Sequence, residues 1–198
     1  MKRLCTYIVT VDTGFAPNPF WGWCTLAACT PNHMNAQLDK GDWIVGFLSK
    51  SKQNKFLFAM EILRVMQMGK YFTDPDFESK KPKNSPDWQE RCGDNIYEQL
   101  EDGTWVQHAI DFHSTEGEKI QDTKHPKVFI ASQFWYFGKE SLIVPPQYAP
   151  LIPDGRGIRC QHNPDLAEQL MRWVAKFPCG VHADPNDRQK INLVQLQK

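Results

Sequence analysis

The chain has 198 residues, and its 23 Lys plus Arg balance its 23 Asp plus Glu, so the formal net charge at pH 7 is zero. A neutral chain lacks the extended positive field that non-specific binding to duplex DNA requires, which favours a small footprint such as a nucleotide, one flipped base or a local basic patch. No stretch approaches the roughly 20 apolar residues of a membrane helix, and Thr6, Tyr7 and Thr10 make the N-terminal run a poor signal-peptide core, so we expect no membrane association and a cytoplasmic location.

Length and cysteine usage set two further expectations. A chain of this size buries roughly 70% of its unfolded surface in one core, which predicts a single domain over residues 1–198. In a cytoplasm, the six cysteines are expected to be reduced thiols.

The first predicted element is a strand over residues 4–11, which is rich in β-branched side chains and delivers Asp12 to its end. The loop that follows, residues 12–23, is dense in prolines, glycines and aromatic rings. Either it lines an aromatic pocket, with Asp12 or Asn18 offering hydrogen bonds to a base edge, or its rings only pin a surface loop to the core.

Residues 24–28 are apolar and predict a strand or a buried helical turn, and residues 34–38 predict a short helix. Cys24 and Cys29 do not have a usual zinc spacing, so we expect two buried thiols there.

A hairpin is predicted next. Residues 40–42 combine Gly and Asp in a turn, residues 43–48 form an apolar strand, and the polar residues 49–55 separate it from a long apolar strand over residues 56–66. Residues 71–77 then place aromatic rings on either side of an Asp-Pro turn, where they would close over the end of a small barrel.

Residues 79–91 are mostly polar and predict a surface loop insertion, with a basic cluster of Lys80, Lys81 and Lys83. This loop is either simply solvated or a mobile flap over an anionic ligand.

Two stretches then supply candidate acid–base groups. Residues 92–95 predict a sharp turn that carries Asp94, and residues 105–110 predict a strand with His108, followed by His113. An imidazole titrates near pH 6.5, so either histidine is a candidate general base, although a histidine on a strand is more often structural.

A strand over residues 128–132 leads into four consecutive rings. Side chains alternate in a strand, so Phe134 and Tyr136 share one face and Trp135 and Phe137 the other. One pair fills the core, and the other either lines a pocket or is core as well.

Prolines extend the chain up to residues 155–159, where two glycines alternate with Arg156 and Arg159. Glycines permit close backbone approach and arginines offer forked donors, so this stretch is the best candidate phosphate site, although such pairs also occur on ordinary surfaces.

An amphipathic helix is predicted over residues 164–177, with Asn163 as its N-cap, and residues 179–198 form a weakly patterned tail. Two Cys–His pairs lie at the ends of this helix, which would hold them roughly 20 Å apart. We therefore expect no metal site from Cys160, His162, Cys179 and His182.

The order of turn, strand, hairpin, long strand and aromatic DPxF segment over residues 40–77 resembles the PUA-like barrels, which include EVE and YTH domains that hold a modified nucleobase in an aromatic pocket. A narrower resemblance, over residues 4–175, is to the second family of nucleotide modification associated domains, which occur in phages and bacteria near genes for altered DNA bases. Its motifs are Asp12–Gly22, Lys40–Gly46, Cys92–Tyr97, Ser132–Gly138 and Gly155–Arg159.

These resemblances imply an α+β fold, with a small PUA-like mixed or antiparallel β-barrel and peripheral helices. They imply binding of a modified nucleotide, or of a single flipped base in DNA, among aromatic side chains, with Arg156 and Arg159 on phosphate. The expected base-binding residues are Phe15, Asn18, Trp21, Trp43, Tyr71 and Tyr136.

Two other functions stay open. An enzyme acting on a modified base or nucleotide, a glycosidic hydrolase or group transferase, would use Asp12, Asp94 and His113. However, the sequence has no Walker loop, dinucleotide fingerprint, deaminase zinc motif or nucleophile elbow, and no cofactor is expected. A protein–protein adaptor with exposed rings at its interface is the third hypothesis.

Overall fold

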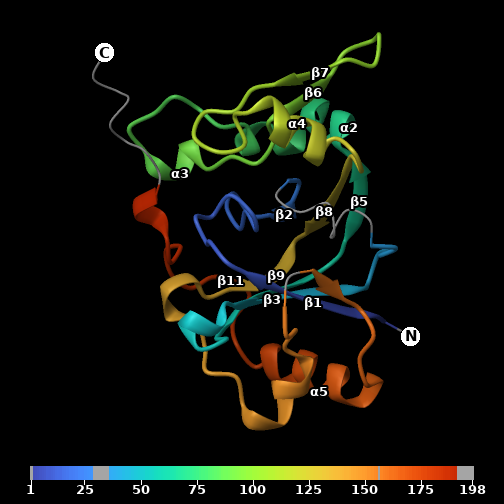
Figure 1. Ribbon diagram of the computed structural model, residues 1–198, viewed down its shortest axis with the longest axis vertical. Helices are drawn as coiled ribbons and strands as arrows, with labels where there is room; N and C mark the ends of the chain where they lie inside the picture. The colour runs from blue at the N-terminus through green and yellow to red at the C-terminus, as the bar shows by residue number, and fades with distance from the viewer. Residues whose placement is uncertain (1, 29–35, 156, 191–198) are drawn as a thin grey trace.

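The computed structural model describes residues 2–28, 36–155 and 157–190, and Figure 1 shows that strands and short helices are interspersed along the chain. The predicted α+β class is confirmed. The strands are β1 Leu4–Val9, β2 Cys24–Leu26, β3 Trp43–Leu48, β4 Phe56–Glu61, β5 Arg64–Gln67, β6 Tyr97–Gln99, β7 Trp105–Gln107, β8 Lys127–Ala131, β9 Gln133–Tyr136, β10 Ile158–Arg159 and β11 Gly180–Val181. The α-helices are α2 Met68–Thr73, α3 Trp88–Arg91, α4 Glu116–Asp122 and α5 Pro164–Val174, and the 3-10 helices are η1 Lys50–Lys52, η2 Pro75–Lys80, η3 Gly138–Glu140, η4 Pro146–Leu151 and η5 Arg188–Lys190.

The largest sheet has the strand order β10-β1-β3-β4-β9-β11. In it β1 is parallel to β3 and β9 is parallel to β11, whereas the other neighbours are antiparallel. A second sheet has the order β2-β8-β5, and β6 pairs with β7. Figure 1 shows the second sheet rising from the layer of β1, β3 and β9 towards α2, α3 and α4, with α5 on the other side of that layer.

The two sheets are joined by a bent two-stranded ribbon. Only Ile62 and Leu63 separate β4 from β5, and only Ser132 separates β8 from β9. The strand predicted over residues 56–66 is therefore two strands, because the backbone N–H of Leu63 turns to donate to Ile130 O at 2.8 Å and the ladder changes sheet there.

The large sheet is open among the described residues. Its terminal strands, β10 and β11, have two residues each and do not pair with one another, so the closed barrel expected from the sequence is not formed by this part of the chain. Strands this short offer too few ladder hydrogen bonds to close a barrel.

Side chains alternate across the large sheet as predicted. Phe134 and Tyr136 of β9 pack between the two sheets, whereas Trp135 and Phe137 pack on the face covered by α5 and η4. Both faces are core, so neither pair is left to line an open pocket. A third apolar layer lies between the second sheet and α2.

The predicted C-terminal helix is confirmed as α5, although it ends at Val174 rather than at residue 177. The Asn163 side chain accepts a hydrogen bond from Leu166 N at 3.1 Å, and Pro164 occupies the first turn. The expected helix over residues 34–38 lies mostly outside the described residues, and residues 36–38 are irregular. No helix in the described ranges has the length and apolar composition that a membrane crossing needs.

Cys5 and Cys160 form a disulfide between β1 and β10, so the expectation of six reduced thiols is wrong for this pair. The antiparallel register places Thr6 opposite Arg159, which sets Cys5 opposite Cys160 with their Cα atoms 4.1 Å apart. Cys24, Cys92 and Cys179 are free, and Cys29 lies outside the described residues.

We expect the Cys160→Ser variant to lose about 2–4 kcal/mol of unfolding free energy, because the bridge closes a loop of 155 residues and so restricts the unfolded chain. Thermal unfolding should show this as a melting temperature lower by roughly 5–15 °C. The matched control is Cys179→Ser, which replaces an exposed free thiol and should leave the melting temperature unchanged. If a reductant lowers the melting temperature of Cys160→Ser as much as that of the wild type, the bridge is not the cause.

Candidate functional site

The loop of residues 12–23 is anchored at its start by Asp12, whose carboxylate is buried. One oxygen accepts from the Tyr136 hydroxyl at 2.6 Å, and the other accepts from the backbone and side-chain nitrogens of Asn186, both at 2.9 Å. Burial raises the pKa of Asp12, and the bonds from Asn186 and Tyr136 oppose this effect. Asp12, a predicted catalytic candidate, therefore ties the end of β1 to the C-terminal segment.

The far end of the loop is closed by Asn18 and Thr25, whose backbone N–H and C=O groups exchange two hydrogen bonds of 2.9 Å. The Asn18 side chain donates to Gly14 O at 3.0 Å and to Cys92 O at 2.8 Å. The Asn18 side chain is buried and its amide nitrogen donates to two backbone carbonyl groups, so Asn18 holds the loop in place from its buried side.

A buried ammonium group lies under the loop. Lys80 Nζ donates to Asn18 O at 2.9 Å, to Asn18 Oδ1 at 2.7 Å and to Trp23 O at 2.8 Å, which uses all three of its donors. Burial lowers the pKa of Lys80 to about 8, and the charge of Asp94 opposes this effect. The expectation that Lys80 belongs to an exposed basic cluster is wrong, because η2 turns this side chain inward onto carbonyl groups.

Asp94, the second catalytic candidate, is also buried and has both oxygens occupied. They accept from the Thr25 hydroxyl at 2.7 Å and from the Tyr71 hydroxyl at 2.8 Å. Burial raises the pKa of Asp94, and the positive charge of Lys80 opposes it. Burial likewise raises the pKa of the neighbouring Cys24 thiol to about 12, so this thiol is neutral and unreactive.

Partly exposed rings gather on the outer side of the loop around the buried ring of Phe20. The ring of Phe20 makes edge contacts with Trp21 at 5.7 Å and with Trp88 of α3 at 5.6 Å, and Phe112 packs against the buried pair of Phe20 and Cys92. We call Phe20, Trp21, Trp88 and Phe112 the aromatic cluster. The guanidinium group of Arg188 lies 4.8 Å from the centre of the Trp88 ring.

Trp21 has the backbone conformation of a left-handed residue, with φ +56°. This region costs a bulky L-residue about 1–2 kcal/mol and persists only where the surroundings enforce it. Here the Asn18–Thr25 pair and the bond from Trp23 N to Phe20 O enforce it. The result is a partly exposed tryptophan in a turn that is closed by these hydrogen bonds.

His113, the third catalytic candidate, lies beside this loop. Its ring is 5.0 Å from that of Phe15, and its Nδ1 is hydrogen-bonded to Asp122 Oδ2. The Tyr97 hydroxyl donates to the same oxygen at 2.8 Å. His113 also has a left-handed backbone, with φ +52°. The structure thus brings His113 close to Phe15 but leaves Asp12 and Asp94 in separate buried networks.

The residues expected to form one aromatic pocket are distributed over different layers. Trp43 stacks on Trp135 at 5.3 Å on the face covered by α5, and Tyr136 lies on the opposite face of the same sheet. Phe15 and Tyr71 belong to the layer under α2. Strand alternation keeps these rings apart, so the expected pocket is not formed by the six residues together, and Trp21 alone among them is partly exposed.

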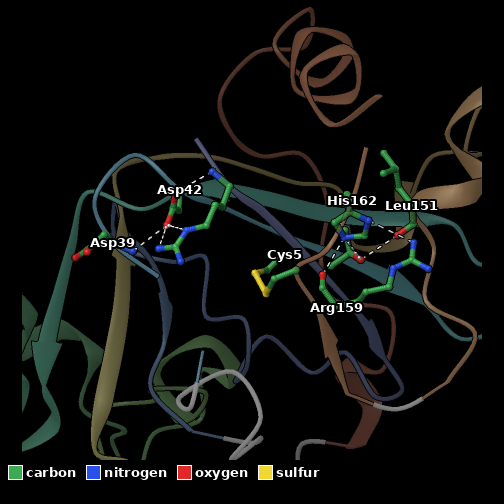
Figure 2. Close-up of a disulfide and its surroundings, with 9 residues drawn as sticks. Cys5, Asp39, Asp42, Leu151, Arg159 and His162 are labelled. Carbon is green, nitrogen blue, oxygen red and sulfur yellow. Dashed lines mark hydrogen bonds and ion pairs between the residues drawn. A yellow bond between two sulfur atoms is a disulfide. The ribbon is translucent and has the colours of Figure 1, made fainter. Parts of the chain in front are cut away.

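Of the two arginines in the candidate phosphate loop, Arg159 can be described, and Arg156 lies outside the described residues. Figure 2 shows Arg159 beside His162 and Leu151, close to Cys5. The Arg159 guanidinium donates to Pro150 O, and His162 Nε2 is 2.8 Å from Arg159 O. Arg159 therefore directs its charge at a backbone carbonyl.

Two hollows were found away from the aromatic cluster. One, of about 410 Å³, lies between the β3–β4 turn and the segment that leads to the phosphate loop, and its polar lining residues are Lys50, Asn54 and Asp154. The other, of about 310 Å³, lies against the start of α5. Neither is lined by an aromatic ring, so neither supplies a stacking surface for a base. Within the described ranges, no group of three or more His, Cys, Asp or Glu side chains is placed to hold a metal ion.

Sequence reasoning missed several residues of this region, among them Phe112. Trp88 is the single aromatic residue in the polar stretch of residues 79–91, and this could have indicated that its ring has a contact to make. Asp122 is the last residue of α4. The start of this helix could have been predicted from Thr115 and Glu118, which form a capping box. Tyr97 and Arg188 had no local signal for their roles here, because the side chains concerned, Asp122 for Tyr97 and Trp88 for Arg188, are distant in the sequence.

A family model described as Nucleotide modification associated domain 2 matches residues 1–192 of the chain. No curated protein and no solved structure matches the chain.

We expect Lys80→Met to cost about 3–5 kcal/mol of unfolding free energy, because it leaves buried carbonyl groups and Asp94 without their positive partner. Urea unfolding followed by circular dichroism measures this. The control Lys83→Met removes an exposed lysine paired with Glu90 and should cost less than about 1 kcal/mol. Adding Asp94→Asn to Lys80→Met should recover part of the loss; equal costs for the two lysine variants would contradict this account.

Stability should fall as the pH drops below 6.5, in part because of His162. Burial lowers the pKa of His162 below its ordinary value of 6.5, so the unfolded chain binds a proton in a pH range where the folded chain does not. This contribution is complete above pH 6.5 and is lost as the pH falls through the folded pKa. The slope of unfolding free energy against pH should be shallower in His162→Gln than in the wild type; identical slopes would exclude the contribution.

Proposed function

Because the chain belongs to the family described as Nucleotide modification associated domain 2, we propose that it binds a modified nucleobase or nucleotide on the aromatic cluster, in a setting of DNA modification. The observation that carries the proposal is that Trp21 and Trp88 are both partly exposed and both pack edge-on against the ring of Phe20. Trp21 occupies a turn position with positive φ that usually holds Gly, Asn or Asp, so a bulky ring is kept there at some cost.

The aromatic cluster has the features that base recognition needs. Stacking of one base on an aromatic side chain is worth roughly 1–3 kcal/mol, and it tolerates chemical change on the base because every base has a π-face. The loop beneath Trp21 is fixed by the Asn18–Thr25 pair and by Lys80, so little ordering entropy is lost on binding.

An anion contact is available next to the rings. The guanidinium of Arg188 lies over Trp88 and pairs with Asp184 at 2.7 Å, and its side chain is 41% exposed. Arg188 takes the phosphate role in this proposal, because Arg159 is directed at Pro150 O. One arginine and a neutral chain suit a nucleotide or a single flipped base better than a long duplex.

The proposal extends to the fold. We assign residues 1–198 to one domain with a distant PUA-like architecture, in which the parallel pair β1–β3 and the antiparallel run β3-β4-β9 form the barrel wall and the ends stay open. The parallel and antiparallel registers of these strands support this assignment.

Trp21→Gly and Trp88→Ala should each weaken nucleotide binding by roughly 5- to 150-fold, the equivalent of one lost stacking contact. The probes are nucleotides and short oligonucleotides with ordinary and modified bases, and mass spectrometry of the retained and unretained fractions identifies the ligand. Tryptophan fluorescence titration then gives the affinity.

The stability of Trp21→Gly should stay within about 1 kcal/mol of the wild type, since glycine relieves the left-handed strain and so offsets the lost ring contacts. Trp43→Phe is the matched control: it perturbs a buried ring under α5 and should lower stability with unchanged affinity. The binding proposal fails if no probe is retained, or if Trp43→Phe reduces affinity as much as Trp21→Gly.

A further inference from the structure

We propose that His113 is a catalytic base at the edge of the aromatic cluster, positioned by Asp122 and Tyr97, and that the chain hydrolyses the N-glycosidic bond of the nucleotide it binds. This inference rests on the proposed binding function and adds a reaction to it. It starts from a side-chain arrangement that the binding role does not require.

The arrangement is a chain of three groups from three segments. The Tyr97 hydroxyl of β6 donates to Asp122 Oδ2 at 2.8 Å, and the same oxygen at the end of α4 is hydrogen-bonded to His113 Nδ1. The Asp122 side chain is 2% exposed, and that of His113 is 15% exposed. A buried carboxylate on Nδ1 fixes the tautomer in which Nε2 carries the lone pair, which is the form that accepts a proton.

His113 also has a left-handed backbone. Among the described residues other than glycine, positive φ occurs at His113, Trp21, Gln53 and Asn54. Gln53 and Asn54 lie in the β3–β4 turn, and Trp21 precedes Gly22 in the turn closed by the bond from Trp23 N to Phe20 O, so positive φ at these three positions is turn geometry. At His113, the Gln107 side chain fixes the backbone by donating to the His113 carbonyl oxygen.

Ring contacts connect His113 to the proposed base site. The ring of Phe15 lies 5.0 Å from the imidazole and 5.2 Å from Phe112, and Phe112 belongs to the aromatic cluster. A base stacked on Trp21 has its sugar at the rim of the stack. The proposal therefore requires the ligand to bind with the bond between base and sugar directed towards Phe112 and His113.

The step adds water across the base–sugar bond. His113 Nε2 accepts a proton from a water molecule, and the water oxygen forms a bond to the anomeric carbon of the sugar. The carbon–nitrogen bond breaks, its electron pair leaves with the base, and the imidazolium returns the proton to that base. Atoms and charge balance without any other reactant, and Asp122 stabilises the imidazolium between the two transfers.

The charged and titratable groups that the described part of the chain places at His113 include two carboxylates and one phenol. Asp122 and Glu118 belong to α4, and Tyr97 belongs to β6. Hydrogen bonds from Thr115 lower the pKa of Glu118, with a smaller contribution from His113. Burial raises the pKa of Tyr97, which therefore stays protonated and remains a donor to Asp122.

The test incubates the full chain with the nucleotides and oligonucleotides described above and follows their masses over time. The wild type should convert a retained species into free base and the corresponding sugar product with the mass of one added water. His113→Gln should slow this conversion at least about 100-fold, the lower end for loss of a general base, while its affinity changes less than about threefold.

Three further variants separate catalysis from structure. Asp122→Asn should slow turnover and move the acidic limb of its pH profile, which a purely structural role would not do. Tyr97→Phe should have a smaller effect in the same direction. His108→Gln is the matched control, because His108 is exposed and hydrogen-bonded at 2.8 Å to Glu98, away from Asp122, and turnover should be unchanged.

Nitrogen-15 NMR of the imidazole supplies a readout that needs no substrate: neutral His113 should carry its proton on Nδ1 in the wild type and lose this preference in Asp122→Asn. Recovery of every retained nucleotide intact, or undiminished turnover in His113→Gln, overturns the catalytic assignment and leaves the binding proposal standing. Failure to retain any probe overturns both.

Discussion

The hydrogen bonds of the buried Lys80 ammonium group hold together the loop of residues 12–23, η2 and the turn that carries Asp94. Removing a charge from water costs several kcal/mol, and the cost is offset only when a full set of partners is in place. These partners are Asn18 and Trp23 from the N-terminal loop, with Asp94 as the nearby counter-charge from a segment much later in the chain. The stabilities of the loop, η2 and the Asp94 turn are therefore coupled, because each supplies part of this set of partners.

The rigidity of this buried layer explains what is possible at the surface above it. A tryptophan in a left-handed conformation relaxes unless its neighbours are fixed, and the closure of the loop by Asn18 and Thr25 fixes them. His113 is fixed in a comparable way by Gln107 and Asp122. The proposed binding and proton-transfer functions both require such fixed groups, and two separate polar networks supply them, one under Trp21 and one around His113.

Features set by local pattern were predictable from the sequence. The bounds of β3, the N-terminus of α5 and the alternation of rings along β9 follow from periodicity and capping, which act over a few residues. Burial of Lys80 was not predictable, because its acceptors lie 57 and 62 positions earlier in the chain. For the site, residue type alone singled out Trp21 and His113 as candidates. Their contact partners were not predictable, since tertiary packing alone brings those segments together.

The bond between Cys5 and Cys160 has a consequence for the order in which the protein is made. Of the described strands, β1 comes earliest in the chain; its parallel neighbour β3 follows soon after, whereas β10, which pairs with its other edge, comes near the C-terminal end. Until Cys160 has been synthesised, the nascent chain carries an unpaired strand edge next to the unbridged Cys5, and such edges are the usual starting points of aggregation. This exposure ends when β10 pairs with β1 and Cys160 forms its disulfide with Cys5.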